Sequence, residues 1–186
     1  MEAFITSTLL VAVAEIGDKT QLLSFVLAAR FPKQPWPIIA GIFFATLLNH
    51  FIAASAGNWL ASLLSPTLLH WALAASFFAF AVWALVPDKF DDTKTHMGKA
   101  GVFTTTALLF FMAEMGDKTQ LATVALAAQY KNLLAVVMGT TIGMMIANVP
   151  AVLLGEALVK KVPLHIMRYI ASALFALIGV LILFVH

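Results

Sequence analysis

Two copies of one polar octapeptide lie inside otherwise apolar sequence. Glu-Ile-Gly-Asp-Lys-Thr-Gln-Leu begins at Glu15, and Glu-Met-Gly-Asp-Lys-Thr-Gln-Leu begins at Glu114, an offset of 99 residues (114 − 15). Charged side chains are costly within a membrane, and those that occur there usually mark ion pathways or substrate sites. A duplicated charge cluster at membrane depth therefore predicts a functional site.

The residue types in the two copies suit a hard cation. The acids Glu15, Asp18, Glu114 and Asp117 contribute four negative charges and the two motif lysines contribute two positive ones, so the formal sum is −2. One divalent cation would neutralise this charge, and carboxylate and amide oxygens favour Mg²⁺, Ca²⁺ or Mn²⁺ over soft metals. Crowded carboxylates in a low-dielectric site also bind protons readily. The pattern predicts exchange of a divalent cation for protons.

A continuous helix would place each acid pair on one face. Glu15 and Asp18 are three residues apart, and Lys19 follows four residues after Glu15, so all three would be neighbours on a helix surface. Gln21 would extend that face by one turn. We expect the four acids to form the metal site, with no catalytic residue and no bound cofactor. Further candidates for the site are Lys19, Thr20, Gln21, Lys118, Thr119, Gln120, Asn49 and Asn148.

Each of these residue types also has a purely structural interpretation. The motif charges can form ion pairs that lock two halves together, although a Glu-Lys pair alone would do so and the extra Asp would be surplus. Thr20, Thr119, Ser24 and Thr123 can bond to their own helix carbonyls. Asn49 and Asn148 can make interhelical hydrogen bonds. Gly17 and Gly116 can serve either close helix packing or a loosened helix.

Composition indicates an integral membrane protein. Of 186 residues, 62% are hydrophobic and 11% charged, against about a quarter charged in soluble domains. The chain has no cysteine, which excludes disulfides and thiolate sites. No H-E-x-x-H or G-x-S-x-G motif is present, so the sequence does not indicate an enzyme. Nothing in it indicates nucleic-acid binding, and a homo-oligomer stays open.

Apolar runs predict an all-α membrane protein with six transmembrane helices. Each run is near the roughly 20 residues that a bilayer core requires. The expected spans are Phe4–Ala29, Ile38–Leu60, Leu68–Val86, Gly101–Ala128, Leu133–Gly155 and Met167–Val185.

The duplication extends over the whole chain. Gly41 and Gly57 match Gly139 and Gly155 at an offset of 98. We therefore expect a first three-helix repeat at 1–86, a cytoplasmic linker at 87–100 and a second repeat at 101–186. Because each repeat crosses the membrane an odd number of times, the second must be inverted. Inverted repeats are typical of secondary transporters, which bind substrate near the midplane.

The basic residues predict the orientation. One set of connections holds eight of them and the opposite face holds only Lys131, so the first set is expected to be cytoplasmic. Both termini would then be periplasmic. The eight are Arg30, Lys33, Lys89, Lys94, Lys99, Lys160, Lys161 and Arg168.

The paired motifs resemble the E-x-G-D-[KR]-[ST] signature of the Gdt-type cation/proton exchanger family, within the lysine-exporter-like superfamily. The resemblance covers essentially the whole chain. It implies a bacterial inner-membrane exporter of Mn²⁺, with Ca²⁺ as the second candidate, in exchange for protons. It also places the cation-site acids on Glu15, Asp18, Glu114 and Asp117.

Two other functions remain open from the sequence. A lysine-exporter-like amino-acid or solute translocator would share the superfamily fold, but it would need a roomy cavity. A membrane subunit that loads metal into exported enzymes would bind metal without transporting it by itself. Flux measurements would distinguish both from a cation exchanger.

Overall fold

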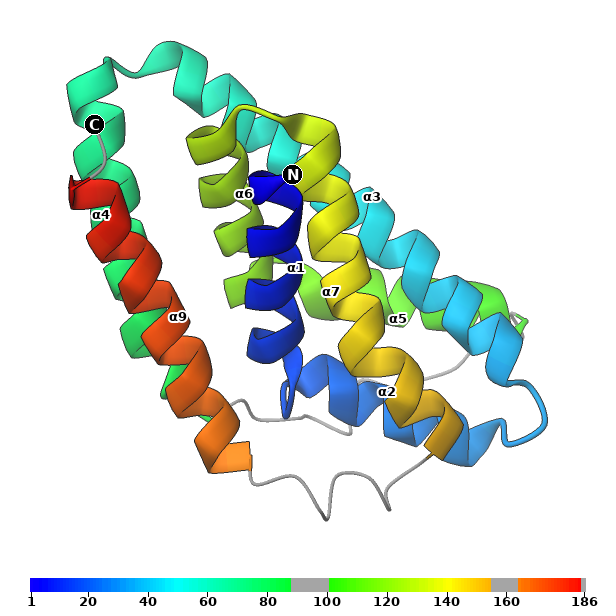
Figure 1. The fold of residues 1–186 in the computed structure, drawn as a ribbon. Helices are drawn as coiled ribbons and strands as arrows, with labels where there is room; N and C mark the ends of the chain where they lie inside the picture. Colours follow the sequence, from blue (N-terminus) through cyan, green and yellow to red (C-terminus); the bar gives the residue numbers. More distant parts are fainter. Residues whose placement is uncertain (88–100, 155–163, 185–186) are drawn as a thin grey trace.

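The chain folds as a set of helices (Figure 1). The computed structural model describes residues 1–87, 101–154 and 164–184, and it places no strand among them. The helices are α1 (Glu2–Glu15), α2 (Lys19–Arg30), α3 (Pro35–Leu63), α4 (Pro66–Ala84), α5 (Val102–Glu114), α6 (Lys118–Tyr130), α7 (Leu133–Leu154) and α9 (Leu164–Phe184). The expected linker lies outside the described residues except for Pro87.

Of the six predicted spans, four are, among the described residues, single helices that are long and apolar enough to cross a membrane. They are α3, α4, α7 and residues His165–Phe184 of α9, and their bounds lie within a few residues of four predicted spans. Pro35 and Pro66 are the first residues of α3 and α4, where a missing N–H costs little. The chain is thus an all-helical membrane protein.

The exposed tryptophans fit a membrane surface. Trp36 lies near the start of α3 and Trp83 near the end of α4, whereas Trp59 and Trp71 lie toward the connection between these two helices. All four side chains are exposed, with Trp36 at 72% of its possible area. Tryptophan is enriched at both membrane–water interfaces because its ring is apolar and its N–H is polar. All four tryptophans thus lie toward the ends of long apolar helices, where interfacial residues are expected.

The first and fourth predicted spans are not continuous helices. α1 ends at Glu15 and α2 begins at Lys19, while α5 ends at Glu114 and α6 begins at Lys118. Each break contains a glycine with positive φ, 84° at Gly17 and 73° at Gly116. That backbone conformation is unfavourable for residues with a Cβ atom. The expectation that each acid pair shares one face of a helix is therefore wrong.

Gly116 is required for the turn rather than for close packing. A Cβ atom added to it would meet no other atom within 4 Å, so neighbours do not exclude a side chain. The positive φ alone accounts for glycine there. Of the two interpretations of the motif glycines, the structure favours the interrupted helix.

Each interrupted helix packs against a long helix from the other half of the chain. α1 lies along α7, and α5 lies along α3. A Cβ atom on Gly139 would lie 2.6 Å from the Phe4 carbonyl oxygen, and one on Gly41 would lie 2.8 Å from the Phe103 carbonyl oxygen. The two contacts join equivalent positions of the repeated sequence. The halves therefore hold each other through the same close backbone contact, made twice.

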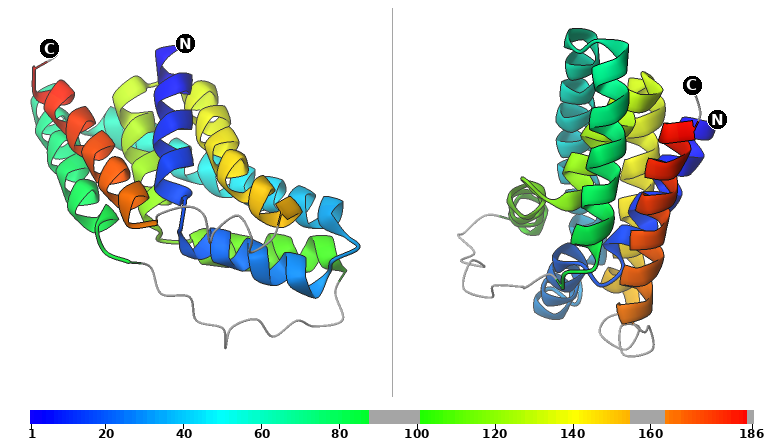
Figure 2. Two further views of the ribbon diagram at one scale, coloured as in Figure 1. Left: turned by 60° about the horizontal axis from the view of Figure 1, so that its bottom comes forward. Right: turned by 90° about the vertical axis from the view of Figure 1, so that its left-hand side faces the viewer.

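The helices α4 and α9 form a pair of their own. Phe77 and Phe80 of α4 pack on Phe175 of α9, with ring centroids 6.4 and 5.8 Å from that ring. The pair packs on α1 and α6. Figures 1 and 2 show α2 and α5 running away from this pair. The α4–α9 pair thus covers one part of each interrupted helix, while α2 and α5 pack mainly on α7 and α3.

Candidate functional site

The two helix breaks meet, and two ion pairs cross between them. Lys19 Nζ at the start of α2 lies 2.8 Å from Asp117 Oδ1, just before α6. Lys118 at the start of α6 forms the reciprocal ion pair with Asp18, just before α2. Each lysine therefore neutralises the aspartate of the other motif copy. The two ion pairs thus join the two copies at one place in the structure.

Three of the four predicted acids form a compact cluster. Glu15, Glu114 and Asp117 each offer one carboxylate oxygen, and these oxygens all lie within 4.8 Å of one another. Opposite ligands around one Ca²⁺ ion are separated by about 4.6–5.2 Å, twice the usual Ca–O distance, and those around smaller ions by less. A single cation can therefore contact all three acids. The fourth acid, Asp18, is buried and paired with Lys118.

Two threonines orient the glutamates. Thr20 Oγ1 donates to Glu15 Oε2 at 2.6 Å, and Thr119 Oγ1 donates to Glu114 Oε2 at 3.3 Å and to Asp117 Oδ2 at 3.1 Å. The other glutamate oxygens, Oε1 of Glu15 and Oε1 of Glu114, are buried without a hydrogen-bond partner among the described residues. A buried carboxylate oxygen without a partner is costly, so both atoms are suited to bind a cation or a proton.

The helix breaks also aim helix ends at the cluster. The first residues of α2 and α6 are Lys19 and Lys118, and the N-terminus of a helix carries a partial positive charge from its free N–H groups. Asp117 accepts a hydrogen bond from the Thr119 N–H, 3.4 Å long, as a cap does. Interrupted helices with ends at a midplane ion site recur in secondary transporters.

The motif glutamines hold the breaks in place. Gln21 Oε1 accepts from the Gly17 N–H at 2.9 Å while its Nε2 donates to the Ala147 carbonyl of α7 at 3.0 Å. Gln120 Oε1 accepts from the Gly116 N–H at 2.7 Å while its Nε2 donates to Asn49 Oδ1 of α3 at 2.9 Å. Each glutamine thus ties the glycine turn of one half to the long helix of the other.

The two asparagines make interhelical hydrogen bonds. Asn49 Nδ2 donates to the Phe111 carbonyl of α5 at 3.0 Å, and Asn148 Oδ1 accepts from Ser24 Oγ of α2 at 2.8 Å. Thr123 bonds back to the Thr119 carbonyl of its own helix at 2.8 Å. Of the further candidates, the structure therefore brings the motif lysines and threonines to the acids. It engages the motif glutamines and Asn49 and Asn148 in hydrogen bonds that position the helices.

Ion pairing alone does not account for all the acids. The two lysines are matched to Asp117 and Asp18, and neither Glu15 nor Glu114 forms an ion pair within the described part of the chain. Both glutamates are fully buried. If the cluster served only to lock the halves together, the glutamates would add cost without benefit. Their presence favours a site that binds a mobile cation.

A family model of cation transporters matches nearly the whole chain. The model of a family described as divalent cation/proton antiporter GDT1 matches residues 3–92 and 102–186. The chain belongs to the GDT1 family. This is a family of transporters rather than enzymes, so a transported metal is substrate and not a resident cofactor.

Relatives within the GDT1 family cover nearly the whole chain. A protein of Vibrio cholerae serotype O1 named "Putative manganese exporter" is 49% identical over 180 residues, which are 96% of this chain and 89% of the relative. GDT1-like protein 5 of Arabidopsis thaliana is 25% identical over 218 residues, covering 97% of this chain and 94% of that protein. A GDT1-like protein of Synechocystis is 26% identical over 201 residues, with 97% and 96% covered. No solved structure matches.

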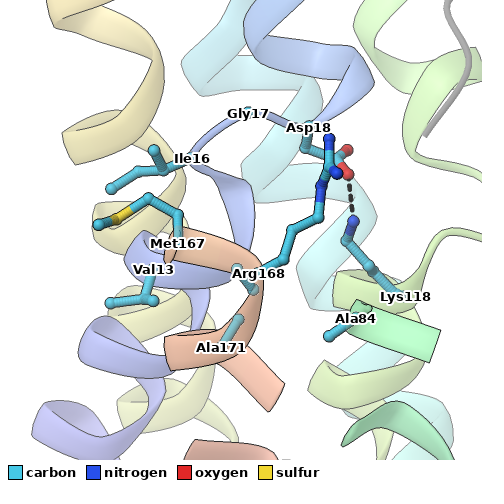
Figure 3. Close-up of a pocket in the computed structure, with 10 residues that line it drawn as sticks. Val13, Ile16, Gly17, Asp18, Ala84, Lys118, Met167, Arg168 and Ala171 are labelled. Atoms are coloured by element: carbon cyan, nitrogen blue, oxygen red, sulfur yellow. Dashed lines mark hydrogen bonds and ion pairs between the residues drawn. The ribbon is translucent and has the colours of Figure 1, made fainter. Parts of the chain in front are cut away.

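Arg168, which the sequence places among the basic residues of the expected cytoplasmic face, lies near the candidate site of this GDT1-family protein. A small pocket, about 10 Å³ in volume, lies beside the Asp18–Lys118 ion pair and includes Arg168 of α9 in its lining. Figure 3 shows the Arg168 side chain extending toward that pair. The signal was present in the sequence, because Arg168 is a charge inside the predicted span Met167–Val185.

Proposed function

We propose that the protein exports a divalent cation from the cytoplasm in exchange for protons, with Mn²⁺ the favoured substrate and Ca²⁺ the second choice. The observation that carries this proposal is the cluster of Glu15, Glu114 and Asp117, whose oxygens come from both halves and lie within 4.8 Å of one another. Asp18 completes the site as the partner of Lys118. The name of the Vibrio cholerae relative favours Mn²⁺.

Charge balance supplies the coupling. The four acids and two lysines sum to −2 when all are ionised, so either one divalent cation or two protons restores neutrality. The two kinds of occupant use the same carboxylates and therefore exclude one another. Lowering the pH on the side where metal is loaded will weaken metal binding. A proton gradient directed into the cytoplasm will drive metal outward.

The proposal includes an inverted repeat with six crossings. It is supported by the reciprocal packing of α1 on α7 and α5 on α3, and by the start of α1 and the end of α9 lying at one end of the molecule (Figure 1). With the basic connections cytoplasmic, both termini are periplasmic in a bacterial inner membrane. Reporter fusions after Lys94 and after His186 test this: a cytoplasmic signal from the second fusion would overturn the topology.

A solute translocator fits the described residues less well. The pocket beside the site is about 10 Å³, close to the room one water molecule needs and far below that of an amino acid. A flux measurement distinguishes the exporter from a metal-loading subunit, since a loading subunit would bind metal without moving it across a membrane.

The experiment is ion flux in proteoliposomes under an imposed pH gradient, comparing Mn²⁺, Ca²⁺ and an amino acid. We expect Mn²⁺ movement driven by an opposing proton gradient and no movement of the amino acid. Metal flux that does not depend on the pH gradient would instead indicate a channel or uniporter for divalent cations. Flux of the amino acid alone would favour the solute translocator.

A further inference from the structure

The apolar core of the described residues is divided into two clusters. One joins α4 and α9 to α1, α6 and parts of α3 and α7, with Phe77 and Phe175 fully buried in it. The other joins α2, α5 and the remaining parts of α3 and α7 around Leu27, Ile42 and Phe110. No described residue of α4 or α9 belongs to this second cluster. Among the described residues, the α4–α9 pair therefore shares an apolar core with one side of the helix breaks and not with the other.

The small pocket lies at this boundary. Its walls come from the end of α1, the first motif turn, the end of α4, the start of α6 and the start of α9. Asp18 and Lys118 form its site-facing wall, and Met167, Arg168 and Ala171 form the wall on the α4–α9 pair. The pocket is thus where this pair and the proposed cation site meet.

Arg168 is the charged residue that the α4–α9 pair presents at this pocket. It is half-buried, it lies in the second turn of α9, and its guanidinium extends toward Asp18 and Lys118 (Figure 3). The guanidinium carries a positive charge and presents several N–H donors. Its positive charge opposes a metal ion and favours an empty, negative site.

We propose that the Arg168 guanidinium acts as a counter-charge of the acid site during transport. It stabilises the negative site when metal is absent, and it moves away from the site when metal binds. This inference rests on the proposed function. Since the four acids and two lysines sum to −2 when all are ionised, Arg168 lowers the electrostatic cost of the metal-free site before protons bind to it. Because Arg168 belongs to α9, occupancy of the site is coupled electrostatically to the position of the α4–α9 pair.

The test compares Arg168→Gln, Arg168→Lys and a matched control, Arg30→Gln, in proteoliposomes. Arg30 is exposed at the last turn of α2, so its removal changes the charge of the protein without touching the pocket. We expect Arg168→Gln to bind Mn²⁺ about tenfold more tightly and to turn over several-fold more slowly, because loss of an opposing charge favours the loaded state. Arg168→Lys should keep most of the wild-type KM and maximal rate.

The outcomes separate this inference from the proposed function. If the wild type moves no metal, the proposed function fails. If the wild type transports and Arg168→Gln keeps the KM and maximal rate of Arg30→Gln, the role of Arg168 is rejected. If Arg168→Gln does not reach the membrane, Arg168→Lys and Mn²⁺ titration of the purified protein decide. A Lys variant with unchanged metal affinity and a rate near zero would show a structural role only and would also reject the inference.

Discussion

The two motif copies are nearly identical in sequence but differ in their surroundings. The Asp117–Lys19 pair adjoins the acid cluster, and the Lys19 side chain is 26% exposed. The Asp18–Lys118 pair lies beside the α4–α9 pair, and the Lys118 side chain is 7% exposed. The two aspartates are therefore placed differently in this structure: Asp117 belongs to the acid cluster as well as to its ion pair, whereas Asp18 lies outside that cluster in a buried ion pair.

The cause of the difference is the position of the α4–α9 pair. It packs on α1 and α6, whereas α2 and α5 pack chiefly on α7, on α3 and on each other. A symmetric sequence thus becomes an asymmetric site because two helices lie on one side of it. In an exchanger built this way, moving the pair would exchange the roles of the two copies, as alternating access requires.

The largest expected effect is from neutralising a cluster glutamate. Glu15→Gln or Glu114→Gln should reduce transport by about 100-fold or more, because even outer partners of a metal site cost 10–100-fold when lost. Either variant should still reach the membrane, which immunoblotting of membrane fractions checks. Flux near the wild-type value in either variant would remove that glutamate from the site.

The two aspartates should fail in different ways. Asp117→Asn removes a cluster ligand and leaves Lys19, which is partly exposed, so we expect metal affinity to fall while thermal stability changes little. Asp18→Asn breaks the buried ion pair with Lys118, and breaking a buried pair by removing one partner typically costs about 3–5 kcal/mol. Its melting temperature should therefore fall more than that of Asp117→Asn. Equal effects of both variants on both measurements would contradict the asymmetry.

A double variant sharpens this comparison. If Asp18→Asn destabilises by breaking this buried ion pair, then Asp18→Asn with Lys118→Gln should regain part of the lost melting temperature, since both charges of the pair are then removed. The corresponding double variant at Asp117 and Lys19 should regain little. Melting temperatures of the single and double variants in detergent give the two coupling energies. A larger coupling for the Asp117–Lys19 pair would overturn our assignment of the buried pair.

The smallest predicted effect concerns the helix breaks. Gly116→Ala should destabilise the protein by about 1–2 kcal/mol, because φ is 73° there and a Cβ atom disfavours that conformation. Gly101→Ala is the matched control, since Gly101 has φ −64° and a Cβ atom would meet nothing within 4 Å. Thermal unfolding of the two variants measures the difference, and an equal change in both would deny a role to the positive φ.

Much of the fold could be predicted from apolar runs, because four of the predicted spans are single long helices, two of which begin at Pro35 and Pro66. The breaks at Gly17 and Gly116 could not, since glycine serves equally well in close helix packing and in a left-handed turn. The helical spacing of Glu15 and Asp18 was therefore the wrong reason to group them.

The composition of the site was easier to predict than its geometry. Charge in an apolar span singles out the motif acids and lysines whatever the backbone does. Which lysine pairs with which aspartate depends on how the halves pack, and the sequence does not contain that information locally. The role of Asn49 and Asn148 was open for the same reason, because an amide can bind a cation or a neighbouring helix equally well.

The central claim is that metal and protons compete for one set of carboxylates drawn from both repeats. Calorimetric titration of the purified protein with Mn²⁺, in buffers of different ionisation enthalpy, counts the protons released on binding. Our account predicts proton release that rises toward two per metal ion at the lower pH values where the acids start protonated, and loss of the binding signal in Glu15→Gln and Glu114→Gln. Tight Mn²⁺ binding that releases no protons at any pH would contradict it.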